Sequence, residues 1–344
     1  MIILGIETSC DETAISVVKA EGDLISLRFN LLGSALHSQI ETHREFGGVV
    51  PMLAKREHIK NLPIVLEKAL KEADIEISKI DIIAVTVGPG LEPALWTGIK
   101  FAEELGKSWG KAVIPTNHMV GHIASVLFNH NKIEFPVLAL LISGGHTELI
   151  FMKSWKDIEK IGETKDDAVG EAFDKVARML GLPYPGGPEI SRLATQAREQ
   201  NIISEYKLPR PMIHSKDFNF SFSGLKTAVL YYIRDLGEIT EKNKLEIARE
   251  FEDAITETLV SKTKKALKKY LPKTLIVGGG VIANKHLREN FLNLNSEYPD
   301  LEILIPEKSL TTDNATMIAG AGYIEYLRDS KKKELKAEGN LNIN

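Results

Sequence analysis

The chain has 344 residues, 43% of them hydrophobic, which is more than a single hydrophobic core usually serves, so we expect two domains. The formal net charge of −4, from 43 basic and 47 acidic side chains, argues against a protein that coats nucleic acid non-specifically, although it leaves room for a local basic patch. The one cysteine, Cys10, cannot form an internal disulfide, which suits a reducing compartment.

The N-terminal run Met1–Glu7 is apolar but lacks the basic segment and the cleavage site of a signal peptide, so it is expected to be a buried strand. Apolar runs elsewhere, such as 135–142, fall far short of the roughly 20 residues that a membrane helix needs. We expect a soluble, cytoplasmic protein that makes no contact with a membrane.

In the first half of the chain, apolar runs with strand character alternate with helical patterns. Strands over 2–6 and 14–18, joined by a turn rich in Ser, Thr and acidic residues, are followed by an alternating run over 24–32, and together they predict an antiparallel meander. A long helix is expected over 49–73, in which Pro63 should kink or divide it. The later elements expected here are a strand over 81–87, a helix over 93–109, a strand over 111–115 and a helix over 118–128.

The second half begins with the same pattern of strand, short polar turn and strand over 135–152, which predicts a duplicated domain. Residues 218–224 are expected to form a loop or an edge strand. The other expected elements are helices over 169–180, 189–200, 225–236, 245–270, 281–294 and 314–327, and strands over 274–277 and 302–305. Residues 331–344 show no core-forming pattern and are expected to be a disordered tail.

His118 and His122 stand four residues apart on a predicted helix. At this spacing two imidazoles lie on one helix face, about 6 Å apart at Cβ, and can bind one divalent metal ion. Because the chain has nine histidines, two unrelated surface or core residues are the alternative interpretation. Asp313, just before the last helix, is the best further ligand, although it could instead be the N-cap of that helix.

Glycine-containing turns after strands let backbone N–H groups approach an anion closely, although most such turns bind nothing. The two hairpin turns could hold a polyphosphate through Thr8, Ser9 and Thr13 in the first, and through Ser143, Gly144, Gly145 and Thr147 in the second. The run Gly278–Gly280 follows a strand and opens a helix, so it could pass beneath a nucleobase or ribose beside the amide of Asn284. The alternative for Gly278–Gly280 is a tight strand-to-helix turn that only caps the helix. Neither the hairpin turns nor this run has the residue pattern of a Walker or a Rossmann phosphate-binding loop.

Two charged segments are open to more than one interpretation. Glu171 and Asp174, near a helix start, could serve either as first-turn carboxylates that stabilise the helix or as a ribose clamp. The five lysines within 262–269 could form a solvated helix face or a strip that binds RNA phosphates. Cys10, beside Asp11 and Glu12, is expected to have a raised pKa and to be a packing residue, not a nucleophile.

Taken together, these motifs resemble the TsaD family, the tRNA N6-adenosine threonylcarbamoyltransferases formerly labelled glycoprotein endopeptidases. The resemblance covers about residues 2–328. It implies an α/β fold of the actin, sugar-kinase and heat-shock-protein (ASKHA) type, with duplicated domains around a nucleotide cleft. The implied domains are 1–133 plus about 311–330, and 134–310. The motifs that carry the resemblance are Gly5–Thr13, Gly47–Pro51, Gly88–Gly90, His118–His122, Ser143–Thr147, Gly170–Lys175, Tyr184–Pro188, Phe220–Lys226, Gly278–Val281 with Asn284, and Thr312–Asn314.

The resemblance also implies the site. His118, His122 and Asp313 would bind one divalent ion, iron or zinc, and no catalytic side chain is assigned. Contacts to threonylcarbamoyl-adenylate, or to ATP, ADP or AMP in its place, are implied for Leu141, Ile142, Ser143, Gly144, Gly145, Asp174, Gly187 and Asn284. Secondary candidates are Thr8, Ser9, Asp11, His146, Glu171, Gly278 and Gly279.

Two positions bear on the branch of the family. The archaeal and eukaryotic branch has tyrosine where this chain has Leu141, which together with His146 indicates the bacterial branch. Val120 stands where that branch often has glutamate, and little effect is expected because the ligands are the flanking histidines.

The implied reaction transfers threonylcarbamoyl from its adenylate to N6 of adenosine 37 in tRNAs reading codons that begin with A, and AMP leaves. The implied partners are tRNA, a smaller TsaB-like paralogue, a TsaE-like ATPase and a separate synthase that supplies the adenylate. A metal-dependent protease is one alternative, although Met119 stands where a zincin has its glutamate base. A small-molecule kinase or nucleotide switch of the same fold is another, and it would not need the histidine pair.

Overall fold

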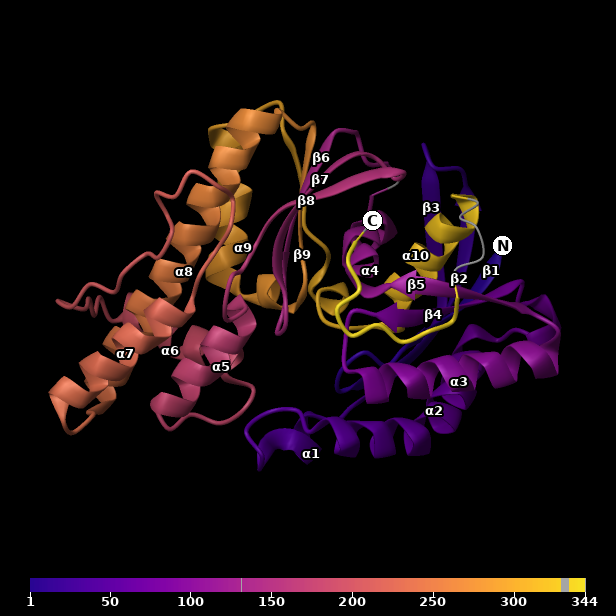
Figure 1. Ribbon diagram of the computed structural model, residues 1–344, viewed down its shortest axis with the longest axis horizontal. Coiled ribbons are helices and arrows are strands. Elements are labelled where there is room, and N and C mark those ends of the chain that lie inside the picture. The colour runs from indigo at the N-terminus through magenta and orange to yellow at the C-terminus, as the bar shows by residue number, and fades with distance from the viewer. Residues whose placement is uncertain (131, 329–333, 344) are drawn as a thin grey trace. The chain divides into compact units, whose positions relative to one another are not determined.

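The structure is a computed structural model that describes residues 1–130, 132–328 and 334–343. The chain divides into two compact units, shown in Figure 1. Unit 1 consists of Met1–Glu134, Lys153–Ile158 and Pro306–Asn344, and unit 2 of Phe135–Met152 and Glu159–Ile305. These bounds differ from the implied domains in that the short segment 153–158 belongs with unit 1 and the last segment of unit 1 begins at Pro306.

Unit 1 is built on a five-stranded sheet in the order β3-β2-β1-β4-β5. The strands β1 (Ile2–Glu7), β2 (Glu12–Gly22) and β3 (Leu27–Ser38) pair antiparallel, so the predicted meander is confirmed. On its other side β1 pairs parallel with β4 (Ile82–Gly88), which pairs parallel with β5 (Ala112–Asn117). Because parallel strands end at the same edge of a sheet, the carboxyl ends of β1, β4 and β5 lie together.

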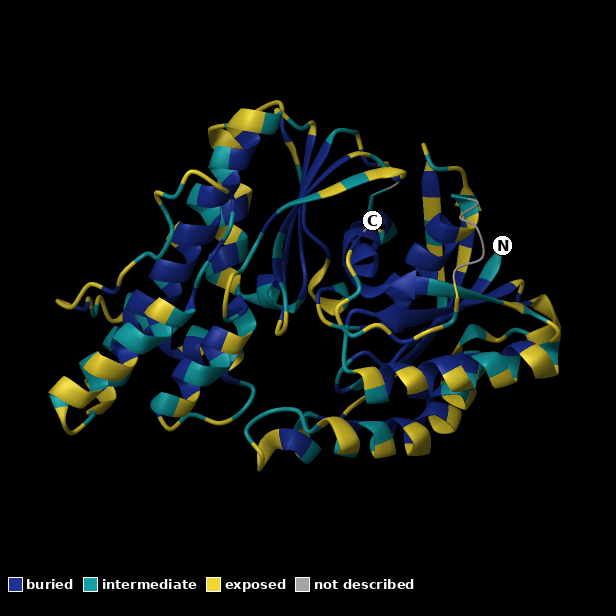
Figure 2. Ribbon diagram, viewed as in Figure 1, coloured by how far each residue is buried: buried dark blue, intermediate teal, exposed yellow. Residues whose placement is uncertain are grey.

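The helices of unit 1 follow the predicted pattern with three differences. The helix expected over 118–128 is an α-helix only over His118–Ala124 and continues as a 3-10 turn. The five-residue α1 was not expected, and α2 runs without a break through Pro63, which was expected to kink or divide it. Residues 315–325 of α10 are all buried, as are most residues of the strands (Figure 2). The helices are α1 (Ile40–Arg44), α2 (Pro51–Ala73), α3 (Glu92–Trp109), α4 (His118–Ala124) and α10 (Ala315–Leu327), with 3-10 turns η1 (Ile77–Lys79), η2 (Ser125–Phe128) and η5 (Lys308–Leu310).

Unit 2 carries a second five-stranded sheet, in the order β10-β9-β6-β7-β8. Its β6 pairs antiparallel with β7 and parallel with β9, and β9 pairs parallel with β10. Counted within each unit, both sheets have the strand order third-second-first-fourth-fifth, so the predicted duplication is confirmed. The edge strand β8 was not predicted, because its charged residues conceal the alternation. The strands are β6 (Val137–Ile142), β7 (Thr147–Ser154), β8 (Asp157–Glu163), β9 (Thr274–Gly278) and β10 (Glu302–Leu304).

Helices complete unit 2 and enclose a core that includes Phe173, Phe220, Phe222, Phe251 and Phe291. The single helix expected over 281–294 is instead a 3-10 turn, a short α-helix and a second 3-10 turn. The elements are α5 (Val169–Met179), α6 (Gly186–Glu199), α7 (Ser223–Leu236), α8 (Glu241–Tyr270) and α9 (Lys285–Leu292), with η3 (Gly280–Ala283) and η4 (Asn293–Ser296).

The described part of the C-terminal segment, residues 334–343, packs against unit 1. The N–H of Glu338 donates to the carbonyl of Val87 at 2.8 Å, and Ile343 is only 3% exposed. Leu335 and Leu341 contact the core of the unit. The expected disordered tail is therefore wrong for these residues, whose apolar side chains are too sparse to form a recognisable period. Residues 331–333 and 344 of the expected tail lie outside the described residues.

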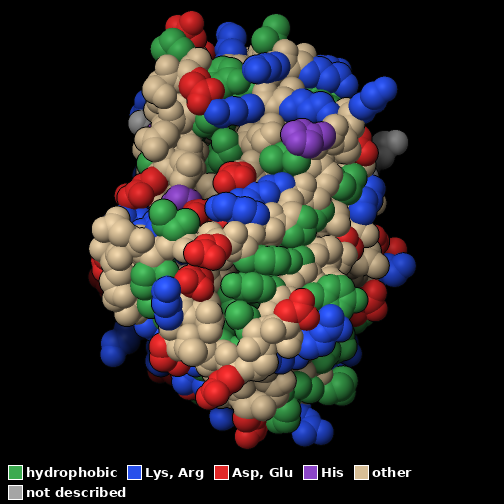
Figure 3. Space-filling view, turned by 90° about the vertical axis from the view of Figure 1, so that its left-hand side faces the viewer, with side chains coloured by type: hydrophobic (Ala, Val, Ile, Leu, Met, Phe, Trp, Pro, Cys, Tyr) green, Lys and Arg blue, Asp and Glu red, His purple; other side chains and the backbone are tan. Residues whose placement is uncertain are grey.

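The described helices include none that is both long and apolar enough to cross a membrane. Figure 3 shows one face of the molecule in space-filling form, on which Lys and Arg side chains gather in the upper part of the view and apolar side chains lie exposed across its middle.

Candidate functional site

The helix that carries the histidine pair, α4, begins directly where β5 ends and is held at its start by Asn117. The side-chain oxygen of Asn117 accepts hydrogen bonds from the N–H groups of Met119 at 2.8 Å and Val120 at 3.3 Å, as an N-cap does. All seven residues of α4 are buried. A Cβ on Gly121 would lie 3.0 Å from Ile318 of α10, so glycine permits the close packing that fixes this helix.

The three residues proposed as metal ligands lie together in unit 1. Oδ1 of Asp313 is 3.4 Å from Nε2 of His118 and 3.3 Å from Nε2 of His122. One ligand atom from each residue lies within 4.8 Å of the other two. The alternative N-cap role of Asp313 is wrong, because the side chain of Asn314 accepts the N–H of Met317 at 2.9 Å and caps α10.

Several observations fit this cluster to a divalent cation. His122 is fully buried, and its ring nitrogens are not satisfied by hydrogen bonds within the described residues, although Nε2 lies 3.3 Å from Oδ1 of Asp313. Buried polar atoms without partners are rare in proteins, and a coordinated ion is one explanation of them. Two imidazoles and one carboxylate form a donor set suited to zinc or iron that leaves positions for substrate or water.

The protonation tendencies of the cluster agree with this fit. Burial lowers the pKa of His122, which favours the neutral ring that a metal requires. Burial opposes ionisation of Asp313, but His118 and His122 hold the pKa of its carboxyl well below the usual range. Burial also disfavours protonated His118, but Asp313 and Glu7 raise the pKa of this ring well above its ordinary value. The cluster therefore attracts one positive charge, which either a proton or a metal ion can supply.

One residue that the sequence did not single out is Glu7, at the end of β1. Its Oε2 lies 3.0 Å from Nδ1 of His118, on the side of the ring opposite to the nitrogen that faces Asp313. Glu7 is fully buried. A lone carboxylate closing an otherwise apolar buried strand is the signal by which the sequence could have identified it.

The secondary candidates of the first hairpin are engaged within unit 1. The hydroxyl of Thr8 donates to the carbonyl of Ala94 at 3.0 Å, and Ser9 Oγ lies 3.3 Å from Nδ1 of His118. Asp11 is 7% exposed. Burial, and then Asp11, raise the pKa of the Cys10 thiol, which agrees with its expected role in packing.

In unit 2, the turn after β6 holds the largest group of implied nucleotide contacts. Leu141 and Ile142 are fully buried in the strand, whereas Gly144 and Gly145 are exposed. The turn is closed by Ser143, whose N–H donates to the carbonyl of His146 at 2.8 Å and whose hydroxyl accepts the N–H of His146 at 3.1 Å. The N–H of Gly170 in the first turn of α5 donates to the carbonyl of Ser143 at 3.2 Å, which brings a helix N-terminus against this turn.

The glycine run after β9 lies against the same turn. Gly279 has φ +93°, and a Cβ there would lie 2.3 Å from the carbonyl oxygen of Ile142. The parallel pairing of β6 and β9, with Leu141 opposite Gly278, brings these two strand ends together. The carboxyl edge of this sheet thus presents two adjacent turns, the position at which open α/β sheets bind ligands.

The remaining implied contacts have structural roles. Asp174 Oδ1 accepts the N–H of Gly186 at 2.7 Å at the start of α6, and Glu171 pairs with Lys175 at 2.8 Å. Asn284 caps α9 by accepting the N–H of Leu287 at 3.0 Å, and its amide donates to Glu252 at 2.6 Å. Gly187 lies in the first turn of α6. The capping interpretation therefore holds for Asn284, and the first-turn interpretation holds for Glu171. Asp174 lies beyond the first turn of α5 and instead binds the start of α6. Contact of Asp174 and Asn284 with a nucleotide stays a prediction.

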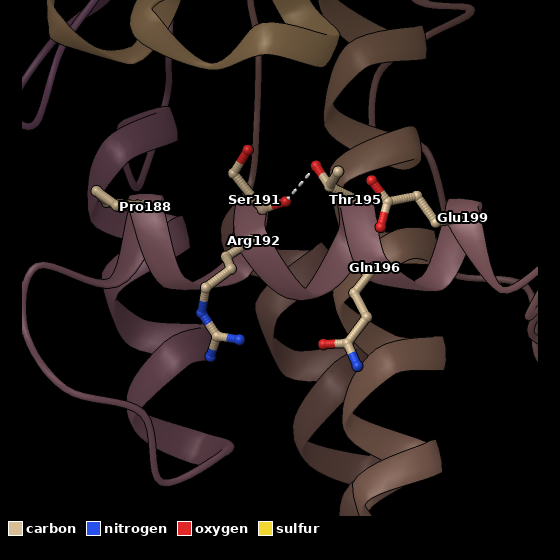
Figure 4. Close-up of a pocket in the computed structure, with 6 residues that line it drawn as sticks. All are labelled: Pro188, Ser191, Arg192, Thr195, Gln196 and Glu199. Atoms are coloured by element: carbon tan, nitrogen blue, oxygen red, sulfur yellow. Dashed lines mark hydrogen bonds between the residues drawn. The ribbon is translucent and has the colours of Figure 1, made fainter.

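An open groove of about 490 Å³ runs along one face of α6 in unit 2 (Figure 4). Thr195 donates to the carbonyl of Ser191 within it at 2.8 Å. The groove contains neither the histidine pair nor any implied nucleotide contact, although Pro188 follows Gly187 directly. Its lining residues are Pro188, Ser191, Arg192, Thr195, Gln196 and Glu199.

The five lysines within 262–269 differ in their exposure, since Lys268 and Lys269 are exposed whereas the other three are half-buried or buried. Lys262 is fully buried and donates to Ser215 and to the carbonyl of Asp217. Lys265 donates to the backbone carbonyls of Ser215 and Asp217, and Lys264 pairs with Glu297 at 2.6 Å. The ammonium groups of Lys262 and Lys265 are therefore bound to the segment 215–217 of unit 2, whereas Lys264 forms a surface ion pair.

Comparisons with known proteins identify the family to which the chain belongs. The sequence profile described as "TsaD: tRNA N6-adenosine threonylcarbamoyltransferase" matches residues 30–320. A protein of Thermosipho africanus (strain TCF52B) with the name tRNA N6-adenosine threonylcarbamoyltransferase is 46% identical over 344 residues, which is 100% of both chains. A protein of Listeria welshimeri with the same name is 45% identical over 334 residues, covering 96% of this chain and 93% of its own.

Two solved structures share the fold. HypF of T. kodakarensis aligns with a TM-score of 0.63 and 12% identity over 95% of this chain and 48% of its own. An activator of the 2-hydroxyisocaproyl-CoA dehydratase from Clostridium difficile with bound ADPNP aligns with a TM-score of 0.52 and 13% identity over 96% of this chain and 97% of its own. These likenesses agree with the expected duplicated α/β fold of the ASKHA type. The extent and identity of the sequence matches show that the chain belongs to the TsaD family, the tRNA N6-adenosine threonylcarbamoyltransferases.

Proposed function

We propose that this protein transfers the threonylcarbamoyl group of threonylcarbamoyl-adenylate to N6 of adenosine 37 in tRNAs reading codons that begin with A, and releases AMP. The observation that carries the proposal is the group formed by the buried His118 and His122 and the partly exposed Asp313, in a chain that belongs to this family. The adenylate comes from a separate synthase, and a TsaB-like paralogue and a TsaE-like ATPase assist the reaction.

The group of three ligands holds one divalent ion, iron or zinc. When bound, such an ion supplies a Lewis acid that polarises or orients a carbonyl group. His122 contributes a ring whose burial favours the neutral, metal-binding form. Asp313 contributes an ionised carboxylate that stays 21% exposed, so its surroundings leave access for substrate.

The adenylate is bound by the turns of unit 2. The exposed backbone of Gly144 and Gly145 and the adjacent turn at Gly279 offer N–H dipoles to the phosphate, whose charge increases as AMP leaves. The N-terminus of α5, which contacts Ser143, adds a positive helix end near this turn. Asp174, Gly187 and Asn284 complete the proposed nucleotide contacts.

A protease is disfavoured by the residues around the histidine pair. A zincin helix has glutamate directly after its first histidine to activate water, and here that residue is Met119, which is 1% exposed. Besides the ligand Asp313, Glu7 is a carboxylate beside His118, but it contacts Nδ1 and not the side of the ring that faces Asp313.

The proposal is tested by supplying the purified protein with tRNA, threonylcarbamoyl-adenylate and its partner proteins, and measuring modified nucleoside by mass spectrometry. We expect about one metal ion per chain, and we expect His122→Ala to lose both the ion and the product while the circular dichroism spectrum is unchanged. His37→Ala, which changes an exposed histidine of unit 1, is the control. Full transferase activity in folded His122→Ala would contradict the metal assignment.

A further inference from the structure

The carboxylate of Glu7 is held in one orientation by groups from two other parts of unit 1. The hydroxyl of Thr86 in β4 donates to Oε2 of Glu7 at 2.8 Å, and the N–H of Ser9 donates to Oε1. The parallel register that sets Ile6 opposite Val85 brings Thr86 beside Glu7. Since both oxygens accept from fixed donors in a fully buried position, the carboxylate cannot turn away from His118.

This orientation determines which nitrogen of His118 carries a hydrogen. The carboxylate of Glu7 has no hydrogen to donate, so it acts as an acceptor toward His118 as it does toward Thr86 and Ser9. Nδ1 of His118, 3.0 Å from Oε2, is therefore the donor. Ser9 Oγ, 3.3 Å from the same nitrogen, can accept from it as well. In the neutral ring, Nε2 then carries no hydrogen and directs its lone pair toward Asp313, 3.4 Å away.

The second histidine lacks such a partner. Both ring nitrogens of His122 are buried without a hydrogen bond among the described residues. The two imidazoles of the site therefore differ: the protein sets the tautomer of His118 before a metal binds, whereas it leaves that of His122 to be set by the metal itself.

We infer that Glu7 is a positioning residue, which orients His118 through Nδ1 so that Nε2 is ready to bind the metal ion. The inference rests on the proposed metal site. A carboxylate behind a ligating histidine fixes the ring and increases its basicity, and loss of such a partner typically lowers metal affinity about 10- to 100-fold. Thr86 acts indirectly, because its hydroxyl restrains the carboxylate of Glu7 and is not hydrogen-bonded to a proposed metal ligand.

The test is the affinity for Zn²⁺ of the purified chain, measured by competition with a chromophoric chelator. In Glu7→Gln, one carboxylate oxygen becomes an NH₂ group, which faces either Nδ1 of His118 or the N–H of Ser9 and cannot accept a hydrogen bond from either donor. We therefore expect the affinity for Zn²⁺ to fall about 10- to 100-fold. Thr86→Val keeps the carboxylate but removes one restraint, and we expect a smaller fall, of about 10-fold or less. Glu325→Gln changes another buried glutamate of unit 1, paired with Arg328 at 2.8 Å, and should bind Zn²⁺ as the wild type does.

A second measurement separates positioning from a general loss of structure. In the Co²⁺ form, the N–H proton of His118 should give a hyperfine-shifted NMR signal that exchanges slowly with solvent, because Glu7 accepts it. Faster exchange of this signal in Thr86→Val, with the signal of His122 unchanged, supports the inference even where Glu7→Gln does not fold. Wild-type affinity in folded Glu7→Gln overturns it and leaves the metal site standing, whereas absence of Zn²⁺ binding by the wild-type chain overturns both.

Discussion

Gly279 marks the point where β6 and β9 end side by side, and its replacement by alanine tests the proposed nucleotide-binding edge of unit 2. The backbone there has φ +93° and ψ 162°, a region that is essentially restricted to glycine. The new Cβ would lie 2.3 Å from the carbonyl oxygen of Ile142, which is backbone and cannot move as a flexible side chain would.

The two effects can be summed to an expected magnitude. A residue forced into this backbone region costs about 1–3 kcal/mol, and a steric overlap that shifts backbone costs about 1–3 kcal/mol more. The expected loss of about 2–6 kcal/mol compares with a typical total stability of about 5–15 kcal/mol. For a domain of this size that corresponds to a fall in Tm of about 5–20 °C.

The assay is thermal unfolding of Gly279→Ala with and without AMP. We expect the lower Tm and also a smaller stabilisation by AMP, because relief of the overlap moves the turn that holds Gly144 and Gly145. Gly224→Ala is the matched control, since its Cβ would meet only Pro211 at 3.6 Å in the first turn of α7, and alanine there is expected to be neutral or stabilising by about 0.5–1 kcal/mol. A wild-type Tm in Gly279→Ala would refute the close approach of the two strand ends.

Three further predictions concern buried polar groups and the C-terminal segment. His58 is fully buried, and its Nε2 is hydrogen-bonded to the carbonyl of Cys10 at 3.0 Å. Because burial lowers the pKa of His58, the unfolded chain binds a proton that the folded chain does not, so the stability of the Zn²⁺-loaded protein should fall as the pH decreases below about 6.5. In chemical denaturation, the free energy of unfolding of His58→Gln should depend less steeply on pH. Replacement of Lys262 by methionine should leave the salt dependence of tRNA binding unchanged in a filter-binding assay, since its ammonium group is bound inside unit 2. If Lys262 contacted a phosphate instead, the slope of log affinity against log salt concentration would decrease in magnitude by about one. Removal of residues 334–344 should lower the Tm by several degrees and weaken Zn²⁺ binding, because Asn117, which caps α4, donates to the carbonyl of Asn342 at 3.1 Å. If the truncated chain has the Tm and the Zn²⁺ affinity of the full chain, this segment does not stabilise α4.

Much of the fold follows from local pattern. Apolar runs predicted the strands at the centres of both sheets, since a strand buried on both faces must be apolar throughout. The recurrence of strand, polar turn and strand at 135–152 predicted the duplication. The pattern failed where burial is partial, as in the charged edge strand β8, and where helices are short, as in α1 and in the divided segment that follows Gly280.

The candidate site was predictable to a different degree in its several parts. The spacing of His118 and His122 follows from helix geometry alone, and the structure places both on α4. The role of Asp313 was ambiguous in the sequence, because Asp and Asn are both good N-caps; the structure shows that Asn314 caps the helix. The lysines of α8 had the spacing of a solvated face, and only tertiary packing places Lys262 against Ser215 and Asp217.

The sequence by itself therefore determined the apolar strands, the duplicated order of elements, the helical spacing of the histidine pair and the position of the glycine turns. Only the tertiary structure decided that Glu7 faces Nδ1 of His118 and that Asp313 faces Nε2 of the same ring. It also decided that the segment 334–343 packs against the start of α4. The physical reason is that periodicity reports the burial of a residue and the neighbours within one or two helical turns. Contacts between Glu7, His118 and Asp313 depend instead on the parallel pairing of β1, β4 and β5 and on the packing of α10, which join segments more than a hundred residues apart.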